Sequence, residues 1–484
     1  MSVLATSHPP NRTRARLLLL VLVCVAVAGV LSPASKLLVV LVPFLSFVIA
    51  LYLHRQHRGY YVGLVCWLFF LTPLLRRLIE FRIGDTTASF VMISPFLACM
   101  AGMAIFRNDW SQLLTPALRN MLFIVSAIAY GTIVGFLSNP RVAVVQDVFG
   151  WISPICFALY IFAQREHLSE LLNSFRLNVL YGVLIMGLYG ICQFFFLPPW
   201  DAFWMENSTL TSIGFPEPME VRVFSTMNTP QPFADYLLCG VMFGITSTRR
   251  IRYLTVPIAL LVLGLTMSRS AWGGGLLGLI VLIISLTARQ RIRIVSLLLA
   301  CLVLVGAALQ IPQINEILTR RVQTLTDIQQ DGSFNDRVQN QREAISAFQS
   351  SPFGLGMGAD GRAKNTGPSY GVPQQSLTLG DNGIEEILLS FGWCGSIVFI
   401  IGFGGALLAC VRTSRNPELM AFKGLLVAMV SQIPLMGIFP GAGGFLVWTP
   451  IAVCLSWKYS RSQEQLPASS RLKTWHSAFA RGAQ

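Results

Sequence analysis

The stretch LTVPIALLVLGLTM (Leu254–Met267), followed after SRS by AWGGGLLGLIVLIISLTA (Ala271–Ala288), decides the fold class of this chain. Neither run contains a charged side chain, and only Arg269 separates them as a charge. A helix needs about 20 apolar residues to cross a bilayer, and the second run approaches that length. The whole chain is 54% hydrophobic and only 12% charged, whereas an average soluble domain is about 25% charged. We therefore expect an all-α polytopic membrane protein.

Similar apolar runs recur along the chain and predict about fourteen transmembrane helices. Two or three runs are short enough to be half-helices, so twelve spans are also allowed. The expected spans lie near residues 17–32, 37–53, 59–75, 88–106, 118–137, 143–163, 177–198, 231–247, 253–268, 271–288, 293–310, 384–411, 420–438 and 443–458.

Arginine clusters in alternate loops give the orientation, because cytoplasmic loops of membrane proteins are enriched in Arg and Lys. They place both termini in the cytoplasm, and the net charge of +14 then needs no nucleic-acid partner. The clusters are Arg55 and Arg58, Arg107 and Arg119, Arg165 and Arg176, Arg249 to Arg252, Arg289 to Arg293, and Arg412 and Arg415. The expected organisation is a tail (1–16), a bundle (17–310) with a periplasmic loop (199–230), a large periplasmic loop (311–383), C-terminal spans (384–458) and a cytoplasmic tail (459–484).

The positions of the cysteines and histidines restrict the chemistry. All ten cysteines lie in or beside apolar runs, which leaves neither a disulfide framework nor a metal-ligand spacing. All five histidines fall on the expected cytoplasmic side. A periplasmic site must therefore use carboxylates, arginines and hydroxyls, and we expect no metal and no cofactor.

Several arginines lie on the face where the charge rule does not expect them. A guanidinium at the membrane border is costly unless an anion meets it, and its planar fork fits two phosphate oxygens at once. Their joint occurrence favours a diphosphate site. The alternative is that they reach lipid headgroups or pair with Glu80, Glu220 or Asp336. The arginines concerned are Arg76 and Arg77, which close the third expected span, Arg222, Arg269, and the loop residues Arg320, Arg321, Arg337 and Arg342.

Two helix starts could take part in such a site. In RVFSTMNTPQPFADY (222–236), Thr229 is the expected N-cap and Pro230 the first helical residue, and a helix N-terminus beside an arginine can hold an anion. In LGDNGIEEILLSFG, Asp381 stands at the start of the next span, one turn before Glu385 and Glu386. Partial desolvation could make a carboxylate there a general base toward a sugar hydroxyl. The alternative is ordinary capping at both starts.

The large loop contains two recognisable segments. Ser333 and Asp336 form a capping-box pattern that predicts a helix to about Gln349, with one apolar face. The stretch FGLGMGADG (353–361) follows and predicts a tight, closely packed turn region.

The order of these features resembles the bacterial O-antigen ligase and O-antigen polymerase superfamily, the WaaL and Wzy proteins. The likeness covers about residues 222–409. It consists of an arginine before a proline-led span, a span ending in SRSAW, a large loop with P-x-G-x-G-x-G (352–358), and an asparagine before the span through FGWCGSIVFI (391–400).

The resemblance implies a function. Members take a glycan from undecaprenyl diphosphate and join it to another sugar on the periplasmic face, without nucleotide or metal. Arg222 and Arg269 would then bind the diphosphate, with help from Arg337 or Arg342. The implied partners are an undecaprenyl-diphosphate-linked oligosaccharide, an acceptor glycan and membrane lipids, with a flippase and a chain-length regulator as further candidates.

One departure from the family pattern changes the expected base. The ligases carry a histidine where this chain has Asp381. Either Asp381 replaces it, or Glu385 or Glu386 does, or this member does not catalyse. The change favours an O-antigen or exopolysaccharide polymerase over a strict lipid A core ligase. We expect a metal-independent, inverting glycosyltransferase of the bacterial inner membrane; the alternatives are a lipid-linked sugar flippase or exporter and a non-catalytic assembly partner.

Overall fold

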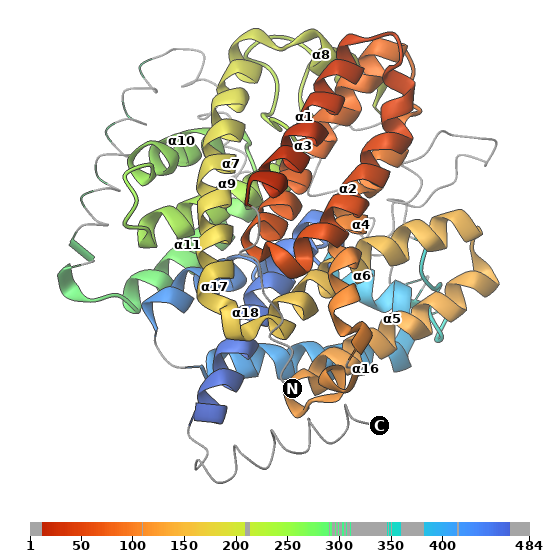
Figure 1. The fold of residues 1–484 in the computed structure, drawn as a ribbon, viewed down its shortest axis with the longest axis vertical. Helices are drawn as coiled ribbons and strands as arrows, with labels where there is room; N and C mark the ends of the chain where they lie inside the picture. Colours follow the sequence, from red (N-terminus) through yellow and green to blue (C-terminus); the bar gives the residue numbers. More distant parts are fainter. Residues whose placement is uncertain are drawn as a thin grey trace, which may run out of the picture.

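The computed structural model describes residues 12–108, 110–208, 213–289, 351–359, 382–413 and 416–464, with isolated positions between 291 and 349. In this part the chain forms fourteen α-helices joined by turns and short 3-10 segments (Figure 1). The helices are α1 Arg12–Leu31, α2 Leu38–Gln56, α3 Arg58–Ile83, α4 Ser94–Ala101, α5 Arg119–Ser138, α6 Arg141–Ala163, α7 Leu168–Phe196, α8 Pro199–Asn207, α9 Pro230–Thr246, α10 Arg252–Leu265, α11 Arg269–Ile284, α16 Gly383–Val411, α17 Pro417–Val430 and α18 Gly441–Glu464.

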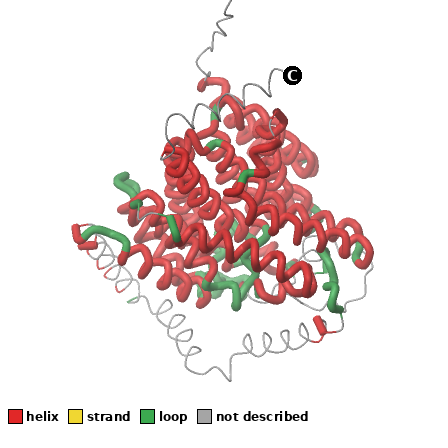
Figure 2. The backbone as a smooth tube through the Cα atoms, turned by 90° about the horizontal axis from the view of Figure 1, so that it is seen from below, coloured by secondary structure: helices red, strands yellow, loops and turns green. Residues whose placement is uncertain are grey.

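The expected fold class is confirmed. Eight helical segments are long and apolar enough to cross a membrane, and three shorter apolar helices accompany them. Figure 2 shows no strand in the described part of the chain, where a lone antiparallel bridge joins Gly214 and Val221. The protein is an all-α polytopic membrane protein. Of the expected spans, the one at 293–310 lies almost wholly outside the described residues.

Helix α9 lies in the middle of the bundle. It packs against α7, α10, α11, α17 and α18. Every residue from Phe233 to Ile245 on this helix is buried. A helix buried on all sides should be apolar throughout, so the one carboxylate within that buried run, Asp235, is notable. The N-terminal helices α1, α2 and α3 run side by side at the edge of the bundle (Figure 1).

Helix α3 is longer than expected. The charges at Arg76 and Arg77 predict the end of a span near residue 75, but the helix continues to Ile83 and ends at Gly84, which has a φ of 72°. The prediction was wrong because both arginines are neutralised inside the bundle by ion pairs with Glu80 and Asp201. A charge with a buried partner does not end a buried helix.

Two other spans are irregular. The segment expected as one helix over 88–106 consists of a 3-10 turn (Ala88–Ile93), the short α4 and a second 3-10 turn (Gly102–Asn108). Pro95 restarts the helix there because it lacks the N–H that a continuous helix would use. Helix α16 is interrupted at Gly392, which has φ 58° and ψ −164°. The sequence pattern predicted a straight span at this place.

Candidate functional site

Arg222 is fixed on the turn that joins α10 to α11. Its guanidinium donates from Nε to the carbonyl of Thr266 and from Nη2 to that of Met267, each at 3.3 Å. The backbone follows the same course, since Val223 N–H donates to Leu265 O at 3.1 Å. The side chain is only partly buried. The structure therefore brings Arg222 to the SRSAW turn, although the two are separated by a complete helical hairpin in sequence.

The SRSAW turn places Arg269 at the first position of α11. The turn is tight because Met267 adopts a left-handed conformation, with φ 52°. Trp272 holds α11 to α10, since its indole N–H donates to Leu263 O at 3.0 Å. Arg269 itself is partly exposed. The arginine thus stands at a helix N-terminus, where the backbone dipole favours an anion.

A buried polar network joins this turn to two other elements. The hydroxyls of Ser268 and Ser270, on either side of Arg269, both donate to Oε1 of Gln231 on α9. Gln231 Nε2 donates to Oε1 of Gln432 at 2.9 Å. Gln432 Nε2 in turn donates to Oδ1 of Asp235 at 3.1 Å. Gln432 belongs to the turn after α17, so the network connects α9, α11 and that turn.

The start of α16 rests on the same turn. Gly383 N–H donates to Ile433 O at 2.8 Å and lies 3.1 Å from Met436 O. Asn382 is the N-cap, because its Oδ1 accepts from the backbone N–H of Ile384 and of Glu385. The capping alternative for Asp381 is therefore wrong in detail: the asparagine after it performs this role. Asp381 itself lies outside the described residues.

Glu385 and Glu386 are both buried, 6% and 3% exposed. Glu385 completes the cap, since Asn382 Nδ2 donates to its Oε1 at 2.5 Å. This side-chain contact holds the amide of Asn382 in its capping orientation, which stabilises the start of the helix. For Glu385 the geometry supports a structural role.

Arg76 and Arg77 lie elsewhere, in the body of α3. Arg76 Nε binds Oε1 of Glu80 at 2.8 Å. Arg77 is 0% exposed; it donates to Asp201 Oδ1 and to the carbonyl of Ser225. Burial raises the pKa of Asp201, and the charge of Arg77 opposes that rise. For both arginines these contacts favour the ion-pair alternative over diphosphate binding.

Arg77 nevertheless supports the site indirectly. The segment after Arg222 is held by Gln193, whose Oε1 accepts from Phe224 N–H at 3.0 Å and Ser225 N–H at 2.7 Å. Gln193 Nε2 binds the other oxygen of Asp201 at 2.7 Å. One buried hydrogen-bond network, made by Arg77, Asp201 and Gln193, therefore supports the segment that follows Arg222.

The glycine-rich end of the large loop is stitched into the bundle, as the sequence predicts for a closely packed turn. Met357 N–H donates to Gly131 O on α5 at 2.8 Å, and Leu355 N–H to Leu389 O on α16 at 2.7 Å. Asn139 Nδ2 binds both Leu355 O and Met357 O. Gly354, Gly356 and Gly358 all have positive φ and meet the backbones of α16, α5 and α6 respectively where a Cβ would stand. No other residue type fits these three positions.

Comparison with known proteins adds one finding. Residues 254–400 match the family model described as O-antigen ligase. These residues carry an O-antigen ligase domain, which supports the expected likeness to the O-antigen ligase and polymerase superfamily. The matched region includes α10, the SRSAW turn, α11, the glycine-rich segment and the first part of α16. No curated protein and no solved structure matches the chain significantly.

The O-antigen ligase domain at residues 254–400 suggests a glycosyltransferase-like role in polysaccharide assembly. The network from Arg222 to α16 is the part of the protein that fits such a role. Arg337 and Arg342, and most of the expected helix up to Gln349, lie outside the described residues. Their assignment stays a prediction.

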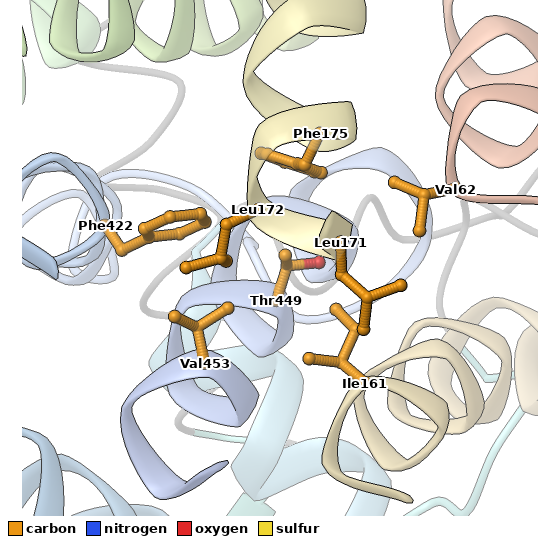
Figure 3. A pocket seen from close by; sticks show the side chains of 8 residues that line it. All are labelled: Val62, Ile161, Leu171, Leu172, Phe175, Phe422, Thr449 and Val453. Carbon is orange, nitrogen blue, oxygen red and sulfur yellow. The ribbon is translucent and has the colours of Figure 1, made fainter. Parts of the chain in front are cut away.

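The protein also has a small apolar cavity between α3, α6, α7, α17 and α18 (Figure 3). Its walls include Phe175 and Phe422, and Thr449 is the one lining residue with a polar side chain. A diphosphate needs cationic or N–H donors, so this cavity does not suit it. It also lies where α6 ends and α7 begins, at the expected cytoplasmic end.

Sequence reasoning missed the buried polar residues that connect the elements of this site, Gln193, Asp201, Gln231, Asp235 and Gln432. A signal was present, because polar side chains within apolar runs are costly and usually functional or structural in purpose. What the signal could not give was the pairing, since Gln231 and Gln432 are far apart in sequence.

Proposed function

We propose that the protein polymerises or transfers undecaprenyl-diphosphate-linked oligosaccharide repeat units during assembly of a cell-surface polysaccharide. The reaction would take place on the periplasmic side of the inner membrane. One observation carries the proposal. Arg222 and the helix start at Arg269 share one turn, and a continuous chain of contacts runs from that turn to Gly383, two residues after Asp381.

The proposed reaction is a direct displacement at the anomeric carbon. The acceptor hydroxyl oxygen bonds to that carbon as the bond to the diphosphate oxygen breaks, and the configuration inverts. Arg222 and Arg269 neutralise the charge that develops on the undecaprenyl diphosphate leaving group, with Arg337 and Arg342 as further candidates. Because the arginines supply this positive charge, the step requires no metal.

Asp381 would accept the proton of the acceptor hydroxyl. Of the three candidate carboxylates, Glu385 is engaged in the cap of α16 and Glu386 is buried beside it. Protonation of Glu385 in every turnover would weaken its hydrogen bond from Asn382 Nδ2, so a carboxylate outside this contact suits the role of base better. This favours Asp381 as the base.

The decisive experiment uses purified protein and lipid-linked repeat units in detergent. Arg269→Ala should lower the rate of chain elongation by about 100-fold or more, because removing one donor to a developing charge has an effect of this order. Arg250→Ala is the matched control, since Arg250 is exposed in an expected cytoplasmic loop and should leave elongation unchanged. Normal elongation by Arg269→Ala would overturn the proposal. A wild-type protein that never elongates alone would support a flippase or an assembly partner.

A further inference from the structure

Asp235 is a carboxylate at the centre of an apolar bundle. It is 1% exposed and lies in the second turn of α9. Its Oδ1 accepts from Gln432 Nε2 at 3.1 Å and, at the limit of a hydrogen bond, from Gln231 Nε2 at 3.5 Å. An ionisable residue in such a place is expensive, and it is retained only where it has a purpose. The proposed reaction as described above does not use it.

The carboxylate gives the network a direction. Oδ1 of Asp235 is the shared acceptor, so both glutamines turn their NH₂ groups toward it. Once Gln231 Nε2 faces Asp235 and Gln432 Oε1, Gln231 Oε1 faces α11. There it accepts from Ser268 and Ser270, the two residues that flank Arg269.

The orientation of the Gln432 amide also affects the start of α16. Gln432 Nε2 donates both to Asp235 and to Ala428 O at 3.0 Å, which fixes the end of α17. The next residue, Ile433, accepts the N–H of Gly383 at the start of α16. A single acceptor on α9 thereby orients two amides: Gln231 holds the serines at the start of α11, and Gln432 fixes the turn whose Ile433 carbonyl accepts from the start of α16.

We propose that Asp235 is a positioning residue: it orients Gln231 and Gln432 so that Arg269 and the start of α16 face one another across the site. This inference rests on the proposed function. The best attested role of buried polar groups in a core is to fix one arrangement among several. Networks of this kind are strengthened when every member is satisfied.

Asp235→Asn tests the proposal, because asparagine keeps the shape but can also donate. Elongation should fall about tenfold in this variant. The double variant Asp235→Asn with Gln432→Glu exchanges the amide and the carboxylate between the two positions. It should recover most of the lost elongation rate. Ser431→Ala is the control: Ser431 is next to Gln432, its hydroxyl donates to Ala428 O, and the variant should behave as wild type.

A second arm separates positioning from general weakening of the fold. If Asp235 acts through Arg269, adding Asp235→Asn to Arg269→Ala should cause little further loss, since coupled residues are not additive. The positioning role would be overturned if the fold losses of Asp235→Asn and Arg269→Ala multiply in their double variant. It would also be overturned if Asp235→Asn with Gln432→Glu recovers no activity. If the wild-type protein elongates chains and Asp235→Asn does so at the same rate, this inference is refuted and the proposed function stands.

The network can also be measured without activity. Thermal unfolding of Asp235→Asn, Ser268→Ala and their combination forms a double-mutant cycle. Non-additive shifts in Tm support a connected network even if the protein elongates nothing, whereas additive shifts overturn it.

Discussion

Arg77 on α3 and Arg269 at the start of α11 carry the same expectation from sequence, yet their surroundings differ. Arg77 is fully buried against the carboxylate of Asp201. Arg269 is partly exposed, and the serines beside it are held by a neutral amide. The difference teaches that an arginine on the unexpected face of a membrane protein must be judged by its exposure and by what neutralises it. Arg76 belongs with Arg77, and Arg222 with Arg269.

The largest effect should come from Arg77→Met. It leaves Asp201 buried without its cation, and breaking a buried pair in this way costs about 3 to 5 kcal/mol. We expect a marked loss of folded protein, measured as the monodisperse fraction after detergent extraction and as Tm. The double variant Arg77→Met with Asp201→Leu should recover much of the stability, because no lone charge remains. Full stability of the single variant would remove the distinction between the two arginine groups.

Arg222→Ala should behave in the opposite way. Its guanidinium donates long hydrogen bonds, each 3.3 Å, to the carbonyls of Thr266 and Met267, so we expect a stability loss of about 1 kcal/mol. Elongation should fall at least tenfold, because a donor to the diphosphate is lost. Arg222→Lys should regain only part of the activity, since lysine lacks the planar fork. Kinetics at varied lipid-linked donor, alongside Tm, check both statements; an unfolded Arg222→Ala would move Arg222 into the structural group.

The smallest effect should come from Arg76→Gln combined with Glu80→Gln. The two side chains lie one turn apart on α3, and replacing both charges leaves no uncompensated one. We expect Tm to change by a few degrees and elongation to stay within about twofold of wild type. A strong loss of elongation at normal Tm would return Arg76 to the diphosphate site.

Much of this fold can be predicted from the sequence because membrane-spanning helices are recognisable as long apolar runs. The prediction failed where a distant residue decides the outcome. The end of α3 depends on Asp201, and the break in α16 depends on Phe353 and Gly354 lying against Gly392. Neither contact leaves a local mark.

For the candidate site, the prediction identified the arginines and the two helix starts but not what joins them. Arg222 and Arg269 could be singled out because their charge violates a topological rule. Gln231 and Gln432 are neutral and obey it, so their pairing required the packed bundle. Asn382 rather than Asp381 caps α16, since the helix begins one residue later than the first possible cap.

The three glycines of the 352–358 segment have a practical consequence for engineering this protein. Because each one contacts the backbone of a different helix, the register of the segment against these three helices is fixed. Adding or deleting one residue between Ser351 and Ala359 would move at least one of these glycines out of register and place a side chain against a helix backbone. Epitope tags and changes in loop length therefore belong outside this short window.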